Sequence, residues 1–143
     1  MTSPLTEPSL HHVGFVVQDI AVGMPGFLKS MAATWDERVF EDPLQRVKVA
    51  FLATRSGDAL IELVEPASDD SPVARFLRER GGGLHHLCYE VADLDQHLAA
   101  MKSRGAMIAK RPQPAVAFQG RPIAWMITRE KLLVEYLQQE KCL

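Results

Sequence analysis

Apolar and polar residues alternate along most of the chain, which predicts strands separated by a few stretches with helical spacing. In the first half, Asp19 is expected to cap a helix that runs towards Ala32, and a turn is expected at 41–43 and a hairpin turn at 56–58. The strands expected around these features cover residues 10–17, 34–40, 47–53 and 60–64. This order is β-α-β-β-β.

The second half repeats the order. A strand at 84–91 leads to a helix that Asp93 caps and that ends near Ser103, with Gly105 as its C-cap. A strand at 106–110, a proline-rich turn at 111–114 and two closing strands at 123–128 and 131–137 complete it. Between the halves, Ser71 and Pro72 begin a short helix over 73–80, which three glycines end.

These patterns predict one α+β domain over residues 1–143, made of two β-α-β-β-β modules at 9–64 and 84–138 with a connector at 65–83. The expected architecture is a half-open, mainly antiparallel, barrel-like sheet with helices on its outer face.

A short stretch occurs twice, and it indicates that the halves are an internal duplication. Residues 10–20 and 84–94 are identical at five of eleven positions at an offset of 74, including Leu-His-His at the start. Four of the five histidines of the chain lie in the two copies. Strand alternation places His12 and His86 on the face opposite the helices, because the large apolar residues of each strand lie on the other face.

The last strand of each module carries a glutamate among apolar residues, Glu62 and Glu135, at an offset of 73. A carboxylate in such a position is costly unless it is paired or bound to a cation. The two histidines and two glutamates therefore predict a four-ligand site for one divalent metal ion, with Co²⁺, Ni²⁺, Zn²⁺, Mn²⁺ and Fe²⁺ all compatible with these donors.

Simpler interpretations exist for each residue by itself. A single strand histidine is often a hydrogen-bonded structural residue, and a single strand glutamate often lies at a solvated edge. Their recurrence at matched positions favours metal binding. His97 is expected to lie on the helix surface, and Cys88 is expected to line a pocket or, as the alternative, to be a soft ligand.

Composition excludes several classes of protein. The 143 residues are 47% hydrophobic with a net charge of −2. The chain therefore lacks the excess of lysine and arginine that is typical of nucleic-acid-binding proteins. The two cysteines, Cys88 and Cys142, form no disulfide framework, and Met1 to Ser9 do not resemble a signal peptide. No apolar run is long enough to cross a membrane, and no nucleophile-elbow motif is present. We expect a cytoplasmic protein.

Segments 47–52, 61–66, 71–77 and 83–86 resemble, in order and spacing, the vicinal oxygen chelate superfamily of glyoxalases, bleomycin-resistance proteins and extradiol dioxygenases. Within it the chain is most similar to the methylmalonyl-CoA epimerases, over about residues 9 to 138. The resemblance implies paired modules with a metal at their interface. The ligand positions of the family correspond in this sequence to His12, Glu62, His86 and Glu135. Epimerases often have Gln at the position of Glu62, whereas glyoxalase I-like members have Glu. Extradiol dioxygenases use two His and one Glu, so a fourth protein ligand makes dioxygen chemistry unexpected.

The sequence also departs from the epimerase pattern. The second acid/base carboxylate of that family aligns with Leu44 or Gln45, with Glu41 and Asp42 slightly upstream. Its His-Gly pair is replaced by Gln119-Gly120, and its longer loop by a tight turn at 128–130.

The resemblance implies a metal-dependent isomerase that removes a proton next to a carbonyl through a metal-bound enolate, acting on an acyl-CoA or related thioester. Glu135 or Glu62 is expected to act as ligand and base, Glu41 as a further catalytic carboxylate, and Gln119, Arg121 and Cys88 as substrate-binding residues. Arg75, Arg78 and Lys110 could also meet an anionic substrate, although solvation is their simpler role. The alternatives are a glyoxalase I-like lactoylglutathione lyase acting on a thiol adduct, and a non-catalytic small-molecule binding protein. A homodimer is expected in each case.

Overall fold

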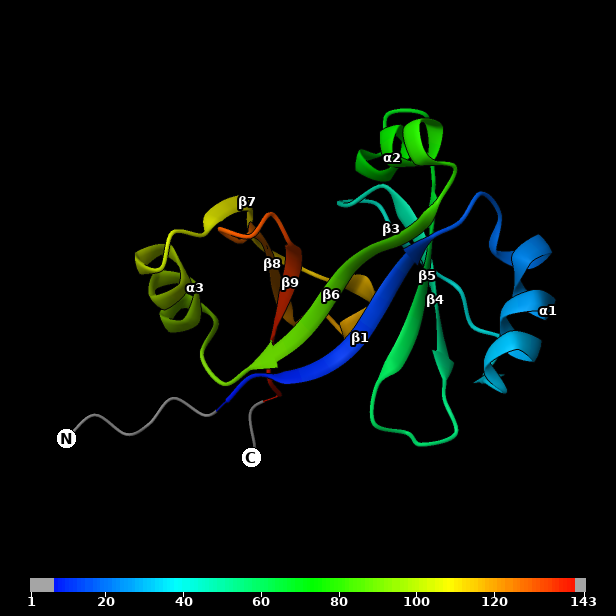
Figure 1. Ribbon diagram of the computed structural model, residues 1–143, viewed down its shortest axis with the longest axis horizontal. Helices are drawn as coiled ribbons and strands as arrows, with labels where there is room; N and C mark the ends of the chain where they lie inside the picture. The colour runs from blue at the N-terminus through cyan, green and yellow to red at the C-terminus, as the bar shows by residue number, and fades with distance from the viewer. Residues whose placement is uncertain (1–6, 141–143) are drawn as a thin grey trace. The chain divides into compact units, whose positions relative to one another are not determined.

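The computed structural model describes residues 7–140, and these residues form two compact units (Figure 1). One unit spans residues 12–85, and the other contains residues 86–140 together with 7–11. The boundary falls inside each histidine doublet, so His11 and His12 belong to different units, as do His85 and His86. Cys142 and the start of the N-terminal stretch lie outside the described residues.

Among residues 7–140, no helix is both long and apolar enough to cross a membrane.

The unit of residues 12–85 is a small mixed sheet with one long and one short helix. The strand order is β2-β4-β5-β1, and β3 pairs with β4. Strands β1 and β5 run parallel, whereas β4 and β5 form an antiparallel hairpin. Its elements are β1 (Ser9–Val16), α1 (Ile20–Met31), β2 (Thr34–Trp35), β3 (Phe40–Asp42), β4 (Val47–Ala53), β5 (Leu60–Pro66) and α2 (Pro72–Arg80).

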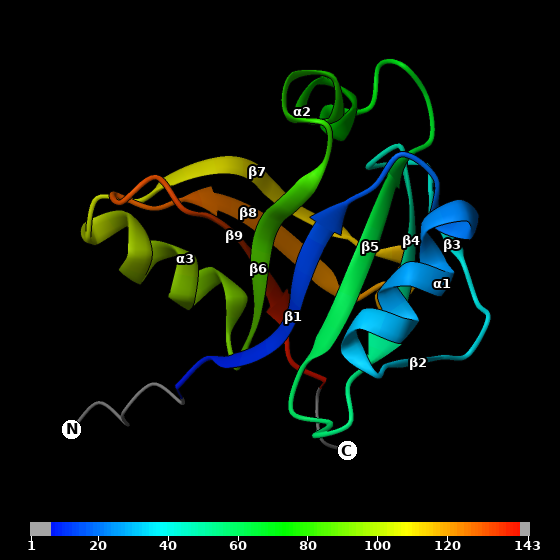
Figure 2. The ribbon, with the colours of Figure 1, turned by 45° about the vertical axis from the view of Figure 1, so that its right-hand side comes forward.

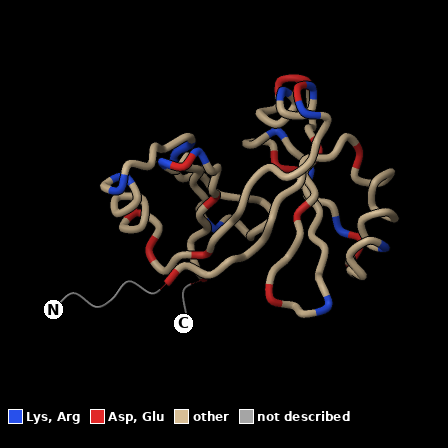
Figure 3. Tube along the Cα trace, viewed as in Figure 1, with Lys and Arg blue, Asp and Glu red and all other residues tan. Residues whose placement is uncertain are grey.

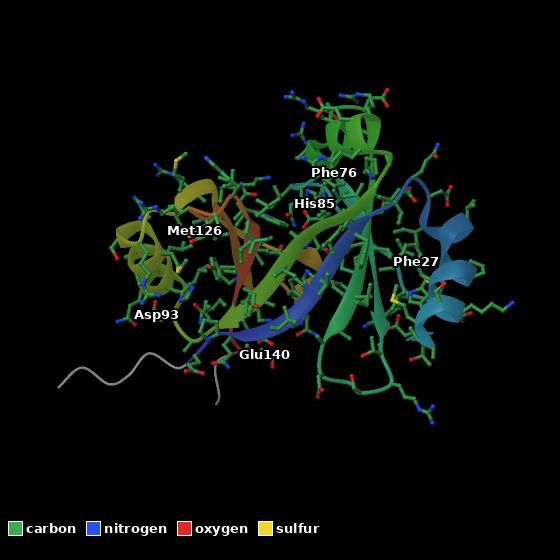
Figure 4. The ribbon with its side chains drawn as sticks, in the orientation of Figure 1. Phe27, Phe76, His85, Asp93, Met126 and Glu140 are labelled. Atoms are coloured by element: carbon green, nitrogen blue, oxygen red, sulfur yellow. The ribbon has the colours of Figure 1, made fainter. Side chains whose placement is uncertain are left out.

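Helix α1 covers one face of this sheet (Figure 2). The carboxylate of Asp19 accepts a hydrogen bond from the backbone N–H of Val22 at 3.1 Å, which satisfies a donor at the start of the helix. Phe27 lies between α1 and the strands, with its ring centroid 6.0 Å from that of Phe15 (Figure 4). The fully buried Leu52 and Leu63 complete this core.

The three glycines after α2 have separate roles. Gly81 ends the helix with φ of 73°, a conformation that glycine adopts without strain. At Gly82, φ is 105° and an added Cβ would lie 2.7 Å from the carbonyl oxygen of Val16, so a side chain cannot fit there. Gly83 begins β6 (Gly83–Val91). The close backbone approach therefore requires the central glycine.

The unit of residues 86–140 repeats the same plan. Its sheet has the order β6-β9-β8-β7, with β6 and β9 parallel and the other pairs antiparallel. Helix α3 packs on the face that carries the buried side chains of Ala124, Met126 and Val134. The further elements are α3 (Leu94–Ser103), β7 (Met107–Pro114), the 3₁₀ turn η1 (Val116–Phe118), β8 (Pro122–Ile127) and β9 (Leu133–Gln138).

Each long helix is held at its start by a side chain from the last strand of its own unit. The Oε1 atom of Glu65 accepts a hydrogen bond from the N–H of Ile20 at 2.8 Å, and the Oε1 atom of Gln138 accepts one from Leu94 at 2.8 Å. The offset between these residues is 138 − 65 = 73, the same as that between the two site glutamates. The duplication therefore extends to the second contact at each helix start.

The predicted α+β class is confirmed, and so is the β-α-β-β-β order of the second module. The strand predicted at 34–40 is wrong at residues 36–39, and Phe40 begins an additional short strand, β3. The turn predicted at 41–43 in fact begins at Pro43, because Glu41 and Asp42 pair with β4. The turn predicted at 111–114 is also wrong. These residues extend β7, which pairs only with β8, and an edge strand with register shifts tolerates proline. The domain boundaries stay a prediction.

Candidate metal centre

A histidine and a glutamate meet in the unit of residues 12–85. The Nε2 atom of His12 lies 3.4 Å from Oε1 of Glu62, and the two residues are 0% and 6% exposed. Parallel pairing of β1 and β5 brings them together, with Gly14 opposite Glu62 and His12 two residues earlier on the same face. Phe51 on β4 is paired with Glu62 on β5, and its ring contacts the His12 imidazole edge to face at 5.4 Å.

The same constellation recurs in the unit of residues 86–140. The Nε2 atom of His86 lies 3.8 Å from Oε1 of Glu135, and both residues are 3% exposed. Glu135 is paired with Cys88 on β6 and with Trp125 on β8. The Trp125 ring contacts the His86 imidazole at 4.7 Å with an interplanar angle of 78°.

In each unit, a histidine, a glutamate and an aromatic ring thus form a trio. The sequence analysis did not identify the aromatic residue of either trio. Phe51 and Trp125 are separated by 74 residues, the same offset as the histidines. Their alternation with neighbouring apolar residues makes them look like ordinary strand residues, and only the cross-strand register shows that each lies opposite a glutamate. Comparing the halves position by position would have revealed the pair.

Both pairs fit a divalent cation. A buried carboxylate needs a compensating positive charge, and an imidazole nitrogen beside it supplies a second donor of the type that Zn²⁺, Co²⁺ and Ni²⁺ accept. Two ligand atoms about 2.1 Å from one ion at a tetrahedral angle are about 3.4 Å apart. The Nε2–Oε1 separations of 3.4 and 3.8 Å are close to that spacing. Each unit thus presents one nitrogen and one oxygen donor at a distance typical of a shared ion.

The two predicted upstream carboxylates differ in their placement. Asp42 is 3% exposed, and its carboxylate accepts hydrogen bonds from the N–H groups of Leu44 and Gln45 at 3.0 and 3.1 Å. It also accepts a bond from the Gln45 side chain at 2.9 Å, so it stabilises the turn between β3 and β4.

Glu41 is exposed and is paired with Lys48, on the face of the sheet opposite the one that carries Glu62. The geometry therefore favours Glu62 and Glu135 over Glu41 as the carboxylate that moves a proton.

The predicted substrate-binding residues fall into different environments. Cys88 is fully buried on the face of Glu135. Arg121 is held by the carboxylate of Glu90 at 3.2 Å and donates to the carbonyl oxygen of Gln138 at 3.2 Å. Gln119 is exposed at the end of η1, with a left-handed φ of 57°. Cys88 and Arg121 are thus fixed in the fold, whereas Gln119 faces solvent.

Acidic and basic residues are mixed along and beside α2, as the colours of that helix show (Figure 3). Arg75 pairs with Glu79 at 2.8 Å, and Arg80 lies over the Phe76 ring at 5.4 Å. Phe76 in turn contacts His85 at 4.9 Å at the start of β6 (Figure 4). Arg78 is exposed and Lys110 is partly buried, and no ion pair of either is found in the described part of the chain.

The surface role predicted for His97 is wrong. The residue is partly buried, its Nε2 atom is inaccessible to solvent, and its ring contacts Tyr136 at 4.4 Å. Burial, with a smaller contribution from the Arg104 charge, lowers the pKa of His97 below its usual 6.5. The imidazole therefore favours the neutral form.

Comparison with known proteins connects this arrangement to a family. A family model for the Glyoxalase/Bleomycin resistance protein/Dioxygenase superfamily matches residues 11–125. The ethylmalonyl-CoA/methylmalonyl-CoA epimerase of Cereibacter sphaeroides is 29% identical over 118 residues, which cover 82% of this chain and 86% of that protein. The uncharacterized protein YqjC of Bacillus subtilis is 32% identical over 123 residues, covering 85% and 84%.

A solved structure shows the same fold. The crystal structure of methylmalonyl-CoA epimerase from Mycobacterium tuberculosis superposes with a TM-score of 0.82 at 25% identity, and the match covers 99% of this chain and 93% of that one. The sequence and structural similarities thus point to the same group of enzymes.

Proposed function

The chain belongs to the Glyoxalase/Bleomycin resistance protein/Dioxygenase superfamily, and on that premise we propose that it is a metal-dependent isomerase of the epimerase type. Its similarity to ethylmalonyl-CoA and methylmalonyl-CoA epimerases supports an enzyme of the isomerase type. The proposed reaction is removal and return of a proton at the carbon next to the carbonyl of an acyl-CoA or related acyl thioester.

The observation that carries the proposal is the repeated buried pair of a histidine and a glutamate. In the proposal, His12, Glu62, His86 and Glu135 together hold one divalent cation, two ligands from each module. When bound, such a cation stabilises negative charge on a carbonyl oxygen as a Lewis acid.

The residues of the chain perform the remaining tasks. One of Glu62 and Glu135 accepts the proton from one face of the carbon next to the carbonyl, and the other delivers a proton to the opposite face, which inverts the configuration. The rings of Phe51 and Trp125 hold each imidazole in one orientation and keep water from the glutamate that is paired with each ring.

The direct test is deuterium exchange. The purified protein is incubated in D₂O with methylmalonyl-CoA, ethylmalonyl-CoA or propionyl-CoA, and deuterium at the carbon next to the carbonyl is followed by NMR or mass spectrometry. We expect metal-dependent exchange with at least one thioester, loss of exchange with a chelator, and recovery on adding Co²⁺ or Zn²⁺.

Matched variants separate metal binding from a general loss of structure. His12→Ala and His86→Ala are compared with His11→Ala and His85→Ala, the other member of each doublet. Metal content should fall in the first pair and stay near the wild-type level in the second. Exchange that survives in both members of the first pair would refute the proposal, as would its absence with every thioester and metal.

A second candidate is supported by Glu62. A carboxylate at this position resembles the glyoxalase I-like enzymes, and it is buried beside His12 at 3.4 Å. The candidate reaction is isomerisation of a thiol hemithioacetal, a lactoylglutathione lyase activity. Turnover of methylglyoxal with glutathione, in the absence of thioester exchange, would select it.

The non-catalytic alternative predicts ligand binding that is indifferent to a chelator and to Glu135→Gln. A homodimer and a cytoplasmic location stay predictions from the sequence. Sedimentation of the purified protein tests the first.

A further inference from the structure

A pocket of about 340 Å³ lies beneath helix α3, on the opposite face of the β6-β9 sheet from Glu135. Eight residues line it: Glu7, Pro8, Tyr89, His97, Ala100, Met101, Arg104 and Tyr136. All eight belong to the unit of residues 86–140 and 7–11. The proposed metal ligands are not among them.

The helix contributes a regular stripe to this pocket. His97, Ala100 and Met101 follow the spacing i, i+3 and i+4, which places them on one face of α3, and the C-cap residue Arg104 follows at i+7. The opposite wall carries Tyr89 from β6 and Tyr136 from β9, which are the only tyrosines of the chain. The side chains of α3 that face the sheet therefore do not fill the layer between the helix and strands β6 and β9, and the pocket lies in that layer.

The first module fills the equivalent space. At an offset of 74, Met101 corresponds to Phe27 and His97 to Gly23. The Phe27 ring lies above Gly23, at 3.6 Å from the position of an added Cβ, and packs against Phe15. The same helix–sheet layer is thus closed by an aromatic ring in one module and open to a pocket in the other.

The polar groups of the pocket have unused hydrogen-bonding capacity. The Nε2 atom of His97 is inaccessible to solvent and has no hydrogen-bond partner within residues 7–140. A buried nitrogen without a partner is unfavourable by a free energy similar to that of a lost hydrogen bond. A ligand hydroxyl would satisfy it once the imidazole turns to bring this nitrogen to the pocket surface. The two side chains with full charges, Glu7 and Arg104, are exposed and of opposite sign.

We propose that this pocket binds a small zwitterionic molecule with an aromatic body, of the α-amino acid class. The carboxylate of the ligand pairs with Arg104 and its ammonium group with Glu7, while the body lies against Met101, Ala100 and the tyrosine rings. A hydroxyl on the body bonds to Nε2 of His97 after the imidazole turns toward the pocket. The pocket volume lies at the low end of the range for small-molecule sites, which favours a ligand of this size.

Four related probes test each contact. The full chain is titrated with free L-tyrosine, with L-phenylalanine, which lacks the hydroxyl, with hydroxyphenylpropionate, which lacks the ammonium group, and with tyramine, which lacks the carboxylate. Binding is followed by the NMR signals of the Ala100 methyl group and the His97 ring. We expect L-tyrosine to bind best and each other probe to bind about 3- to 10-fold more weakly.

Two variants test the location. Met101→Phe copies Phe27 of the first module and should abolish the shifts, with circular dichroism and thermal unfolding confirming the fold. Arg104→Gln changes an exposed residue. It should lower the affinity for L-tyrosine by about 5-fold and leave the affinity for tyramine unchanged.

His86→Ala provides a matched control for the proposed metal centre, and the shifts at Ala100 and His97 should be the same in it as in wild type. The proposal is overturned if L-tyrosine causes no shifts at these residues, if Met101→Phe binds normally, or if tyramine binds as well as L-tyrosine.

Discussion

The two modules share one plan on one face of their sheets and differ on the other. The face away from the helices carries the same trio in both, a histidine, an aromatic ring and a glutamate. The face under the helix is closed by Phe27 in the first module and holds a pocket with His97 in the second. Duplication thus preserved the chemical face, while the packing face diverged.

The difference shows which constraints act on each face. A site that uses matched donors loses its function when one copy changes. A helix–sheet layer, in contrast, needs apolar residues of about the right total volume, so substitutions that conserve that volume are tolerated. The comparison predicts how variants in equivalent positions should behave.

The largest expected effect tests whether the two glutamates are equivalent. Glu62→Gln and Glu135→Gln should each lower the proposed exchange rate, by roughly 10²–10⁴-fold for the residue that moves the proton. Exchange rate and metal content are measured on the same samples. If one variant retains metal but loses exchange, that glutamate is the base, whereas full activity in both would contradict the proposed centre.

The next effect compares the two cores. Leu52 and Met126 are equivalent at an offset of 74 and are both fully buried under their helices. Leu52→Ala should lower the free energy of unfolding by about 2–5 kcal/mol. Met126→Ala should lower the free energy of unfolding by less, because its neighbours border the pocket and are therefore free to move into the space that the methionine side chain leaves. Urea unfolding measures both, with the exposed Val22→Ala as control. A larger loss for Met126→Ala would contradict the difference in packing.

A smaller effect compares the side chains that hold the helix starts. Both Glu65 and Gln138 accept a backbone N–H, but Nε2 of Gln138 also donates to the carbonyl oxygen of Ala92 at 2.7 Å. Gln138→Glu should therefore destabilise by about 1–3 kcal/mol, because a carboxylate cannot donate that bond. Glu65→Gln keeps the acceptor and should cost below about 1 kcal/mol. Equal losses in thermal unfolding would show that the second bond contributes nothing.

The smallest effect is the pH dependence that His97 adds to the second module, since Gly23 occupies the equivalent position in the first. Because the pKa of His97 is lowered in the folded state, the unfolded chain binds the proton first as the pH falls. The stability due to neutral His97 is present above its usual pKa of 6.5 and is lost as the pH falls through that value towards the folded pKa.

The measurement is the free energy of unfolding as a function of pH in a chelating buffer, for wild type and His97→Gln. Wild type should lose more stability than the variant below pH 6.5. Identical profiles would show that burial of this imidazole does not affect its titration.

Local sequence signals predicted most of the elements well. Asp19 and Asp93 cap the helices that they were expected to cap, and the strand expected at 47–53 has those bounds. Capping needs only a side-chain oxygen three residues before its donor, so it can be read from the chain itself. The errors lie where pairing with a distant strand determines whether a residue is in a strand or a turn. Glu41 is an example, because its strand conformation depends on pairing with β4.

The sequence by itself determined the duplication and the histidine and glutamate positions, because strand alternation assigns each residue to a face without knowledge of its neighbours. Only the tertiary structure decided what each of these residues touches. The trios with Phe51 and Trp125 depend on the register between strands, and the pocket beside His97 depends on how much volume the helix and sheet leave unfilled. Register and volume are properties of residues far apart in the chain, so no local pattern encodes them.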